Sequence, residues 1–270
     1  MKKFGLKKVY LFFSSAFIFI IHIPFVFAKS KPISKFFSDR SDVSPVAVTD
    51  TMTLKPDTNA SLKFSLYDSL RLNSFGLGRQ VFDYAMKGFN FMKEMGTLTN
   101  DQVISIVDFS KPSSQKRLFV IDLKNYKILF NTYVAHGVQS GKEFASQFSN
   151  IPESNKSSLG FYETMGTYMG GNGYSLRLQG LESGINDNAN KRDIVIHGAG
   201  YVDERLIRSQ GYIGRSWGCP SVPQRLHKSI IDKIKNGTCL FIFSPDMKYL
   251  THSKILNSNY SPAYVFNQRG

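Results

Sequence analysis

The chain has 270 residues, of which 42% are hydrophobic and 20% are charged, and its formal net charge is +14. This apolar content excludes disorder over the whole chain and suffices for one large domain with an N-terminal extension. The positive charge would attract polyanions, but lysine and arginine are scattered rather than gathered in a stripe, so we predict no nucleic-acid partner.

The first 28 residues have the pattern of a secretory signal peptide. Four lysines within the first eight residues precede an apolar run over 9–28, which ends at Ala28 before Lys29. The run is also close to the roughly twenty residues that span a bilayer, so an uncleaved inner-membrane anchor stays an alternative. In either case we expect the remainder in the periplasm or cell envelope, with an anionic envelope polymer as partner and membrane contact only through the leader.

Two further segments precede the predicted catalytic region. Residues 29–59 are rich in Ser, Pro, Asp and Thr without apolar periodicity, which predicts a flexible linker. Residues 60–100 form a predicted N-terminal helical section, with a helix over 79–94 that ends at Gly96. The apolar stripe of this helix is typical of core packing rather than of a ligand site.

The pattern then changes to short apolar runs bounded by turn residues. We predict strands at 102–109, 117–122, 128–135, 160–167, 175–179, 193–197 and 238–244, with a hairpin through 123–127. A helix over 224–235 would turn Ile230, Ile231 and Ile234 inward. The segment 170–173 lacks the spacing of a dinucleotide or phosphate loop and predicts a turn. The fold class predicted for 101–246 is therefore mainly β, a sandwich or barrel with a few helices, followed by a tail over 247–270.

The chain has only two cysteines, Cys219 and Cys239. In an oxidising compartment a disulfide between them is one alternative. Cys239 lies in an apolar run that predicts a buried strand, where cysteine packs as a small apolar residue. Cys219 lies among glycines and a proline, a setting that favours exposure of its thiol.

A histidine stands about twenty residues before Cys219. His197 ends a β-branched run and precedes glycines, which predicts an imidazole at the end of a strand. A free thiol has a pKa of about 8.5, so a nearby imidazole is the usual means of forming thiolate near neutrality. Backbone N–H groups around Gly218 and Cys219 could bind an oxyanion. Ser216 would either bond the imidazole or complete the turn. This set of residues indicates acyl transfer by a cysteine nucleophile.

The segments 191–198, 214–222 and 157–162 resemble the L,D-transpeptidase family, also called the YkuD-like murein transpeptidases. That family has a histidine-glycine pair followed by a Ser/Thr-His-Gly-Cys motif, matched here by His197-Gly198 and by Ser216 and Gly218-Cys219. Trp217 stands where the family usually has histidine, as in the murein L,D-transpeptidase catalytic domain branch. The resemblance spans about 102–244.

The resemblance implies a β-rich domain in which Cys219 attacks the carbonyl of an L-centre to D-centre bond in a peptidoglycan stem peptide. His197 would take the thiol proton and return it to the leaving amine, with its imidazole oriented by a backbone carbonyl. The acyl-enzyme would pass to a second stem-peptide amine, which gives a crosslink, or to water, which gives carboxypeptidase or endopeptidase activity. We predict no cofactor and no metal.

Five residues are candidates for substrate binding: Arg215, Arg177, Trp217, His136 and Tyr174. Many family members carry a basic or amide residue just after the cysteine, whereas this chain continues Pro-Ser-Val-Pro. Arg215 or Arg177 could supply the missing carboxylate contact, or be a solvated surface charge. Trp217 could wall the site or pack beneath the loop, and His136 could line the cleft or be structural.

Two rival functions remain at this stage. A zinc hydrolase could assemble a site from His136, His197, Asp203 and Cys219, although no HExxH or CxxC spacing supports it. A non-catalytic envelope-binding protein that keeps the fold is the other. The sequence does not predict an oligomeric state.

Overall fold

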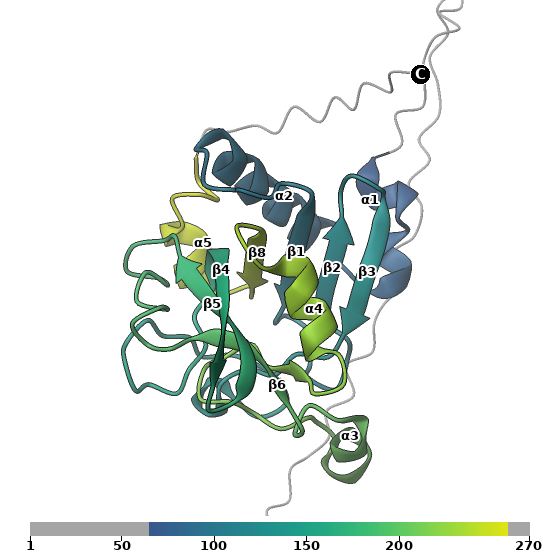
Figure 1. Cartoon of the computed structure of the whole chain (residues 1–270), viewed down its shortest axis with the longest axis vertical. Helices are drawn as coiled ribbons and strands as arrows, with labels where there is room; N and C mark the ends of the chain where they lie inside the picture. The colour runs from purple at the N-terminus through teal and green to yellow at the C-terminus, as the bar shows by residue number, and fades with distance from the viewer. Residues whose placement is uncertain (1–64, 259–270) are drawn as a thin grey trace, which may run out of the picture. The chain divides into compact units, whose positions relative to one another are not determined.

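Eight strands form one mixed, strongly twisted sheet in the part of the chain that the computed structural model describes, residues 65–258 (Figure 1). The strands are β1 (Val103–Asp108), β2 (Leu118–Asp122), β3 (Lys127–Thr132), β4 (Gly160–Gly170), β5 (Gly173–Gly180), β6 (Val195–Ala199), β7 (Val222–Pro223) and β8 (Cys239–Phe243). Their order across the sheet is β3-β2-β1-β8-β4-β5-β6-β7. The predicted leader (1–28) and linker (29–59) lie outside the described residues.

Two parallel pairs interrupt an otherwise antiparallel sheet. The first and last long strands, β1 and β8, run parallel in its middle, and β6 and β7 run parallel at one edge. Every residue of β1 and of β8 is buried. Because alternate side chains of a strand point to opposite faces, both faces of the central sheet must be covered.

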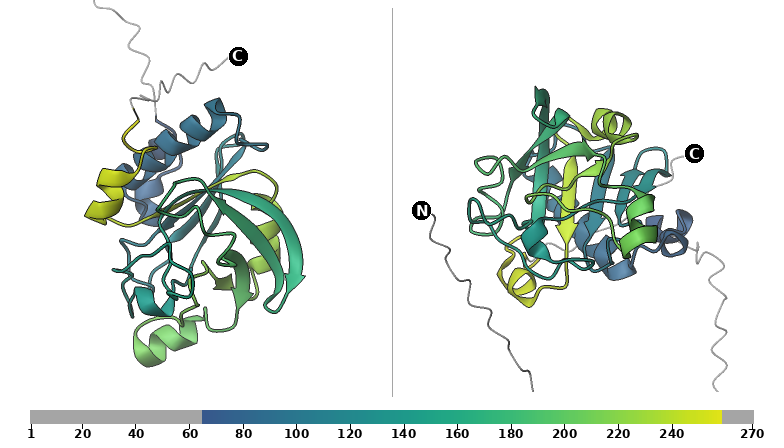
Figure 2. Two further views of the ribbon diagram at one scale, coloured as in Figure 1. Left: turned by 90° about the vertical axis from the view of Figure 1, so that its left-hand side faces the viewer. Right: turned by 90° about the horizontal axis from the view of Figure 1, so that it is seen from below.

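The helices supply this cover. They are α1 (Leu66–Ser69), α2 (Arg79–Glu94), α3 (Glu204–Gln210), α4 (His227–Ile234) and α5 (Met247–His252), with 3-10 turns η1 (Leu72–Phe75) and η2 (Val138–Ser140). Helix α2 contacts β1 and β8, whereas α4 contacts β1, β5 and β6. Gly88 of α2 lies directly against the ring of Phe161, where a Cβ atom would overlap it, so a glycine is required for this close packing. Figure 2 shows α2 and α5 together and α3 at the far end of the molecule.

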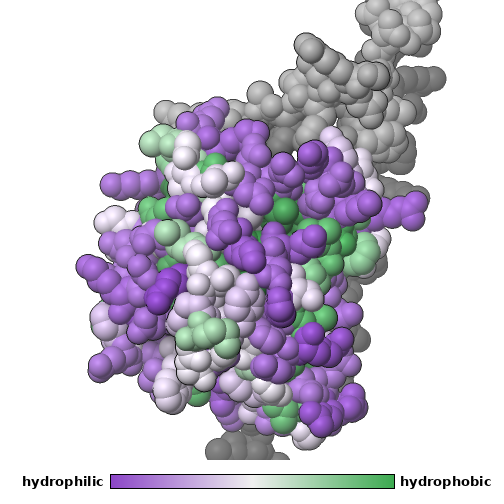
Figure 3. All heavy atoms as spheres, viewed as in Figure 1, coloured by the Kyte–Doolittle hydropathy of each residue, from purple (hydrophilic) through white to green (hydrophobic). Residues whose placement is uncertain are grey.

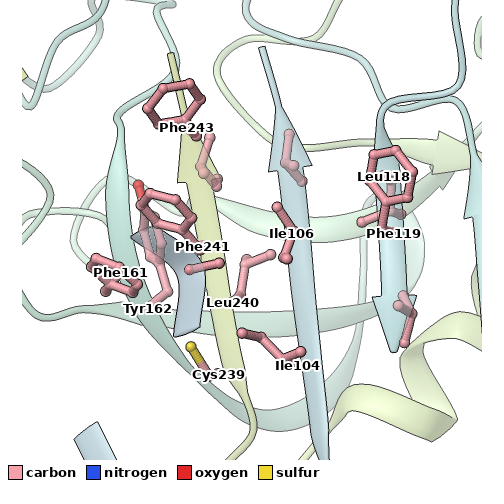
Figure 4. Close-up of a cluster of buried hydrophobic side chains, with 14 of the residues drawn as sticks. Ile104, Ile106, Leu118, Phe119, Phe161, Tyr162, Cys239, Leu240, Phe241 and Phe243 are labelled. Atoms are coloured by element: carbon pink, nitrogen blue, oxygen red, sulfur yellow. The ribbon is translucent and has the colours of Figure 1, made fainter. Parts of the chain in front are cut away.

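Aromatic stacking forms the centre of the core (Figure 4). The rings of Phe161 and Phe241 stack with centroids 4.2 Å apart, and Cys239 lies on the same strand as Phe241 with no exposed surface. The two cysteines are both free. The disulfide alternative is therefore wrong, and burial raises the pKa of the Cys239 thiol far above its ordinary value.

Most predicted elements are present. The helix over 79–94 has the predicted bounds, the three isoleucines of α4 are buried, and the seven predicted strands occur within a few residues of their expected ends. The mainly β fold class is confirmed. The sequence analysis missed α3, α5 and the short strand β7, and the segment from 247 begins not as a loose tail but as α5, whose Tyr249 is buried.

One face of the molecule is largely polar. Hydrophilic residues cover most of the face shown in Figure 3, as expected for a chain with net charge +14. Among residues 65–258, no helix combines the length and apolar character needed to cross a membrane.

Candidate functional site

Strand β6, which lies between β5 and the edge strand β7, carries His197. Its neighbours in register are Ser175 of β5 on one side and the loop that leads into β7 on the other. The imidazole is buried, with 4% of the residue exposed, and both ring nitrogens are engaged. Nδ1 lies 3.0 Å from the Gly198 carbonyl oxygen, and Nε2 lies 2.9 Å from the Ser221 hydroxyl. Since a carbonyl only accepts hydrogen bonds, Nδ1 carries the proton, and the lone pair of Nε2 faces the Ser221 hydroxyl.

The Cys219 thiol lies beside the same strand. Its sulfur accepts the N–H of Val195 at 3.5 Å and donates to the carbonyl of Asp193 at 3.5 Å. Val195 and His197 are two residues apart on one strand, a separation of roughly 7 Å along the chain. The Cys219 sulfur therefore lies beside the backbone of the strand that carries His197. In the described residues the thiol and the imidazole form no hydrogen bond with each other.

The loop that carries Cys219 is held by its own serine. Ser216 Oγ accepts the Gly218 N–H at 3.1 Å and donates to the Cys219 carbonyl at 2.6 Å. Gly218 has φ +125°, and a Cβ there would lie 2.9 Å from the Ile194 side chain and 3.0 Å from the Lys156 carbonyl oxygen. Only glycine accepts both this φ and this close contact.

An irregular segment, residues 140–158, packs against the loop that carries Cys219. Ser157 donates its hydroxyl to the Gly218 carbonyl at 2.9 Å. Arg192 ties the segment to the site: Nη1 donates to the Ser149 carbonyl and Nη2 to the Lys156 carbonyl, each at 2.7 Å. The guanidinium lies close to the backbone of Gly218, so a fixed positive charge is held next to the thiol.

Without substrate, the surroundings of Cys219 and His197 favour a neutral thiol and a neutral imidazole. Burial raises the pKa of the Cys219 thiol, while the Val195 N–H and the Arg192 charge act to lower it. Burial lowers the pKa of His197, against the Gly198 carbonyl, which raises it. At neutral pH the imidazole is therefore uncharged and able to accept a proton, and the thiol keeps its proton until it is removed.

Three of the five substrate-binding candidates lie near this pair. Trp217, two residues before Cys219, is 82% exposed, so the alternative that it packs beneath the loop is wrong. Arg177 pairs in register with Val195, is exposed, and stacks its guanidinium on Tyr168 at 4.1 Å. Arg215 is half-buried, donates to the Gly141 carbonyl at 3.1 Å and lies over the Tyr212 ring at 5.8 Å.

The other two candidates do not face the site. His136 has no exposed surface, and its Nδ1 lies 2.7 Å from the buried guanidinium of Arg117. Its backbone carbonyl accepts the Ser216 N–H at 2.9 Å, so its role is to support the loop. Tyr174 lies one residue before Ser175 and so points to the opposite face of the sheet from His197, where its hydroxyl donates to Asp232 of α4.

Two expected backbone roles also need correction. The Gly218 N–H is occupied by Ser216, so it is not a free donor for an oxyanion. The Cys219 N–H interacts with the sulfur of its own side chain, where it acts to lower the pKa of the thiol. Ser216 completes the turn and makes no bond to the imidazole.

Sequence reasoning missed four contributors to the site: Arg192, Asp193, Ser221 and Tyr201. Asp193 has φ +53°, an uncommon conformation for a residue with a side chain, and this turn aims its carbonyl at the thiol. Arg192 and Asp193 lie inside a segment that carried the family resemblance, so their positions alone were a usable signal. Ser221 also lies in such a segment, whereas Tyr201 lies outside all of them.

Two cavities open elsewhere on the surface. One, of about 370 Å³, lies beyond the end of β6 and is lined by residues that include Arg205, Arg208 and Arg225. The other, of about 440 Å³, lies beside Phe144 and Met247. Neither includes Cys219 or His197. Within residues 65–258, no three His, Cys, Asp or Glu side chains are grouped as metal ligands would be.

Comparison with known proteins identifies a family that matches this chain. A family model described as the L,D-transpeptidase catalytic domain matches residues 74–243. No curated protein matches the chain. The match includes α2, so the helical section predicted over 60–100 is partly within the family region rather than separate from it.

Solved structures similar to the chain are distant. An L,D-transpeptidase from Mycobacterium smegmatis is 13% identical with a TM-score of 0.32, covering 53% of this chain and 59% of that one. A variant of the helical cell shape determining protein Pgp2 from Campylobacter jejuni is 14% identical with a TM-score of 0.37, covering 63% and 58%. An L,D-transpeptidase from Stackebrandtia nassauensis is 15% identical with a TM-score of 0.32, covering 62% and 67%.

The chain spans about three fifths of the length of the first of these structures. The family model, in contrast, matches well over half of this chain and includes both the histidine strand and the cysteine loop. The chain belongs to the L,D-transpeptidase catalytic domain family.

Proposed function

We propose that the protein is an enzyme that cleaves and rejoins peptidoglycan stem peptides through an acyl-enzyme on Cys219. The observation that carries this proposal is the placement of the thiol between the Val195 N–H and the Asp193 carbonyl, beside the strand that holds a neutral His197. A thiol beside a strand that carries a neutral imidazole provides the nucleophile and the base that nucleophilic catalysis needs.

The chemistry would proceed in two stages. His197 Nε2 takes the thiol proton as Cys219 Sγ attacks the carbonyl carbon of an L-centre to D-centre bond. The negative charge that develops on the carbonyl oxygen would be met by the Cys219 N–H and by the positive charge of Arg192. The leaving amine then receives the proton from the imidazole, and the donor stays attached to sulfur as a thioester.

In the second stage an amine of another stem peptide attacks the thioester. His197 removes a proton from that amine and passes it to the departing Cys219 sulfur, the thioester bond breaks, and a new peptide bond crosslinks the two stems. Attack by water instead would release a shortened stem peptide, so crosslinking and trimming share one intermediate. We propose crosslinking or remodelling as the main outcome, with hydrolysis as the alternative.

Two exposed side chains would hold the donor. Arg177 is in register with Val195, next to the thiol, and guanidinium binds carboxylates through paired hydrogen bonds. Trp217 offers an exposed ring beside the nucleophile. The leader pattern over 1–28 supports action outside the cytoplasm, in the periplasm or cell envelope, where the substrate is located.

A product analysis tests this function. The protein from Lys29 onward, reduced, is incubated with purified disaccharide-tetrapeptide, and the products are identified by mass spectrometry, with Cys219→Ala as the matched control. A crosslinked dimer that depends on Cys219 supports transfer, and a tripeptide without dimer supports hydrolysis. An unchanged substrate with every stem-peptide donor would contradict the proposal and favour an envelope-binding protein.

A further inference from the structure

We propose that Ser221 and Tyr201 are positioning residues that hold His197 as a neutral base with its lone pair on Nε2. The proposal rests on the proposed function, because it assigns a role to the partners of the proposed base. Ser221 lies two residues after the nucleophile, in the segment where the chain departs from the basic or amide residue of many relatives.

The hydrogen bonds form a chain with one direction. His197 Nδ1 donates to the Gly198 carbonyl at 3.0 Å, so Nε2 can only accept. The Ser221 hydroxyl lies 2.9 Å from Nε2 and therefore donates to it. The Tyr201 hydroxyl lies 2.9 Å from Ser221 Oγ and, because the Ser221 proton is already used, it is Tyr201 that donates.

Backbone contacts fix both hydroxyl-bearing residues. Ser221 has no exposed surface; its N–H donates to the Cys219 carbonyl at 3.0 Å, and its own carbonyl accepts the Ala135 N–H at 2.8 Å. The Tyr201 carbonyl accepts the Gly214 N–H at 2.8 Å, at the start of the cysteine loop. One tight turn thus fixes the nucleophile and the hydroxyl that touches its base.

This arrangement has two consequences for the imidazole. A donor at Nε2 stabilises the neutral ring, because a protonated Nε2 would have to face a hydroxyl that is turned toward it. The hydrogen bonds also select one tautomer of His197 and fix the plane of its ring, since each ring nitrogen has a separate partner. Thiol and imidazole are not bonded to each other here, so Nε2 exchanges the Ser221 hydroxyl for the thiol proton when catalysis begins.

Titration of His197 by NMR tests the proposal without any substrate. The protein is labelled with ¹⁵N-histidine, the His197 signal is identified with His197→Ala, and its tautomer and titration midpoint are followed against pH. In Ser221→Ala we expect the midpoint to rise by about one pH unit, since a hydrogen bond of ordinary net strength separates two protonation states by that much. We also expect the single tautomer to become a mixture.

Tyr201→Phe removes one oxygen and should move the midpoint in the same direction by less. Tyr212→Phe is the matched control. Its hydroxyl does not belong to the hydrogen-bond series from Tyr201 through Ser221 to His197, so the variant should leave the titration midpoint of His197 unchanged. If Ser221→Ala does not fold, Tyr201→Phe alone decides. An unchanged midpoint and tautomer in both variants would overturn the proposal.

A second readout separates this proposal from the proposed function. Alkylation of Cys219 by iodoacetamide is followed against pH in the same variants. If His197→Ala leaves that pH profile unchanged, the proposed cysteine and histidine pair fails. In the other case, His197→Ala changes the pH profile of alkylation. If Ser221→Ala and Tyr201→Phe then leave the acidic midpoint of that profile in place, only the positioning role of Ser221 and Tyr201 fails.

Discussion

Replacing Arg192 should weaken both the fold and the nucleophile, by amounts that the structure allows us to separate. The guanidinium donates to two backbone carbonyls at 2.7 Å, and Arg192→Gln would leave them without charged donors. Hydrogen bonds to a charged group contribute about 1.5–3 kcal/mol each, and because Arg192 is only partly buried we take the lower end, about 3 kcal/mol in total. That corresponds to a fall in Tm of about 6–12 °C.

Arg192→Lys is the matched variant, because it keeps the charge but not the planar fork that reaches two carbonyls at once. It should lose about half as much stability, about 1.5 kcal/mol. Since the positive charge lowers the pKa of the Cys219 thiol, alkylation of Cys219 at pH 7–8 should be slower in Arg192→Gln than in Arg192→Lys.

Thermal unfolding and the rate of iodoacetamide labelling measure these two effects on the same samples. Equal Tm values for Arg192→Gln and the unmodified protein would refute the role of the guanidinium in holding residues 140–158. Equal labelling rates in the two variants would refute its electrostatic role at the thiol.

The remaining predictions concern four other residues. Gly218→Ala should destabilise the protein by about 1–3 kcal/mol in urea unfolding, because φ +125° strains any residue with a Cβ, and an unchanged midpoint would contradict this. Trp217→Ala should raise KM while leaving Tm unchanged, since the ring is 82% exposed; a large fall in Tm would show that it packs. Cys239 should resist iodoacetamide until the protein unfolds, because burial raises its pKa, and a second adduct by mass spectrometry on the native protein would be inconsistent with it. His136 is held neutral by burial, with its pKa lowered to about 3, so only the unfolded state binds its proton below the ordinary histidine value. Its contribution to stability should therefore fall by about 2 kcal/mol from pH 6.5 to pH 5, and His136→Gln should remove that part of the pH dependence.

The periodic elements could be predicted because their burial follows from local patterns. The apolar spacing over 79–94 and the isoleucines of α4 each describe one buried face, and the structure uses those faces as expected. Strand β7 and helices α3 and α5 were missed because they are short and their apolar residues are few. Their positions depend on partners distant in sequence, such as the buried Glu182, which accepts a hydrogen bond from Tyr249.

The candidate site divides in the same way. Cys219 and His197 could be proposed because their residue types and glycine neighbours are unusual and because the pattern resembles a known family. The occupied Gly218 N–H, the burial of His136 and the contacts of Ser221 could not, because each depends on the three-dimensional arrangement of the loops around the site. Tyr174 lies on the opposite face of the sheet from His197. Its neighbour Ser175 is the residue that pairs with His197, and successive residues of a strand point to opposite faces.

The measurement that tests the central claim most directly is capture of the acyl-enzyme. The reduced protein is mixed with disaccharide-tetrapeptide, quenched in acid after short times and digested, and the peptide that contains Cys219 is examined by mass spectrometry. We predict a transient adduct on Cys219 equal in mass to the donor without its terminal D-residue, and none in Cys219→Ala. Product formation by Cys219→Ala, or an adduct on another residue, would contradict the account.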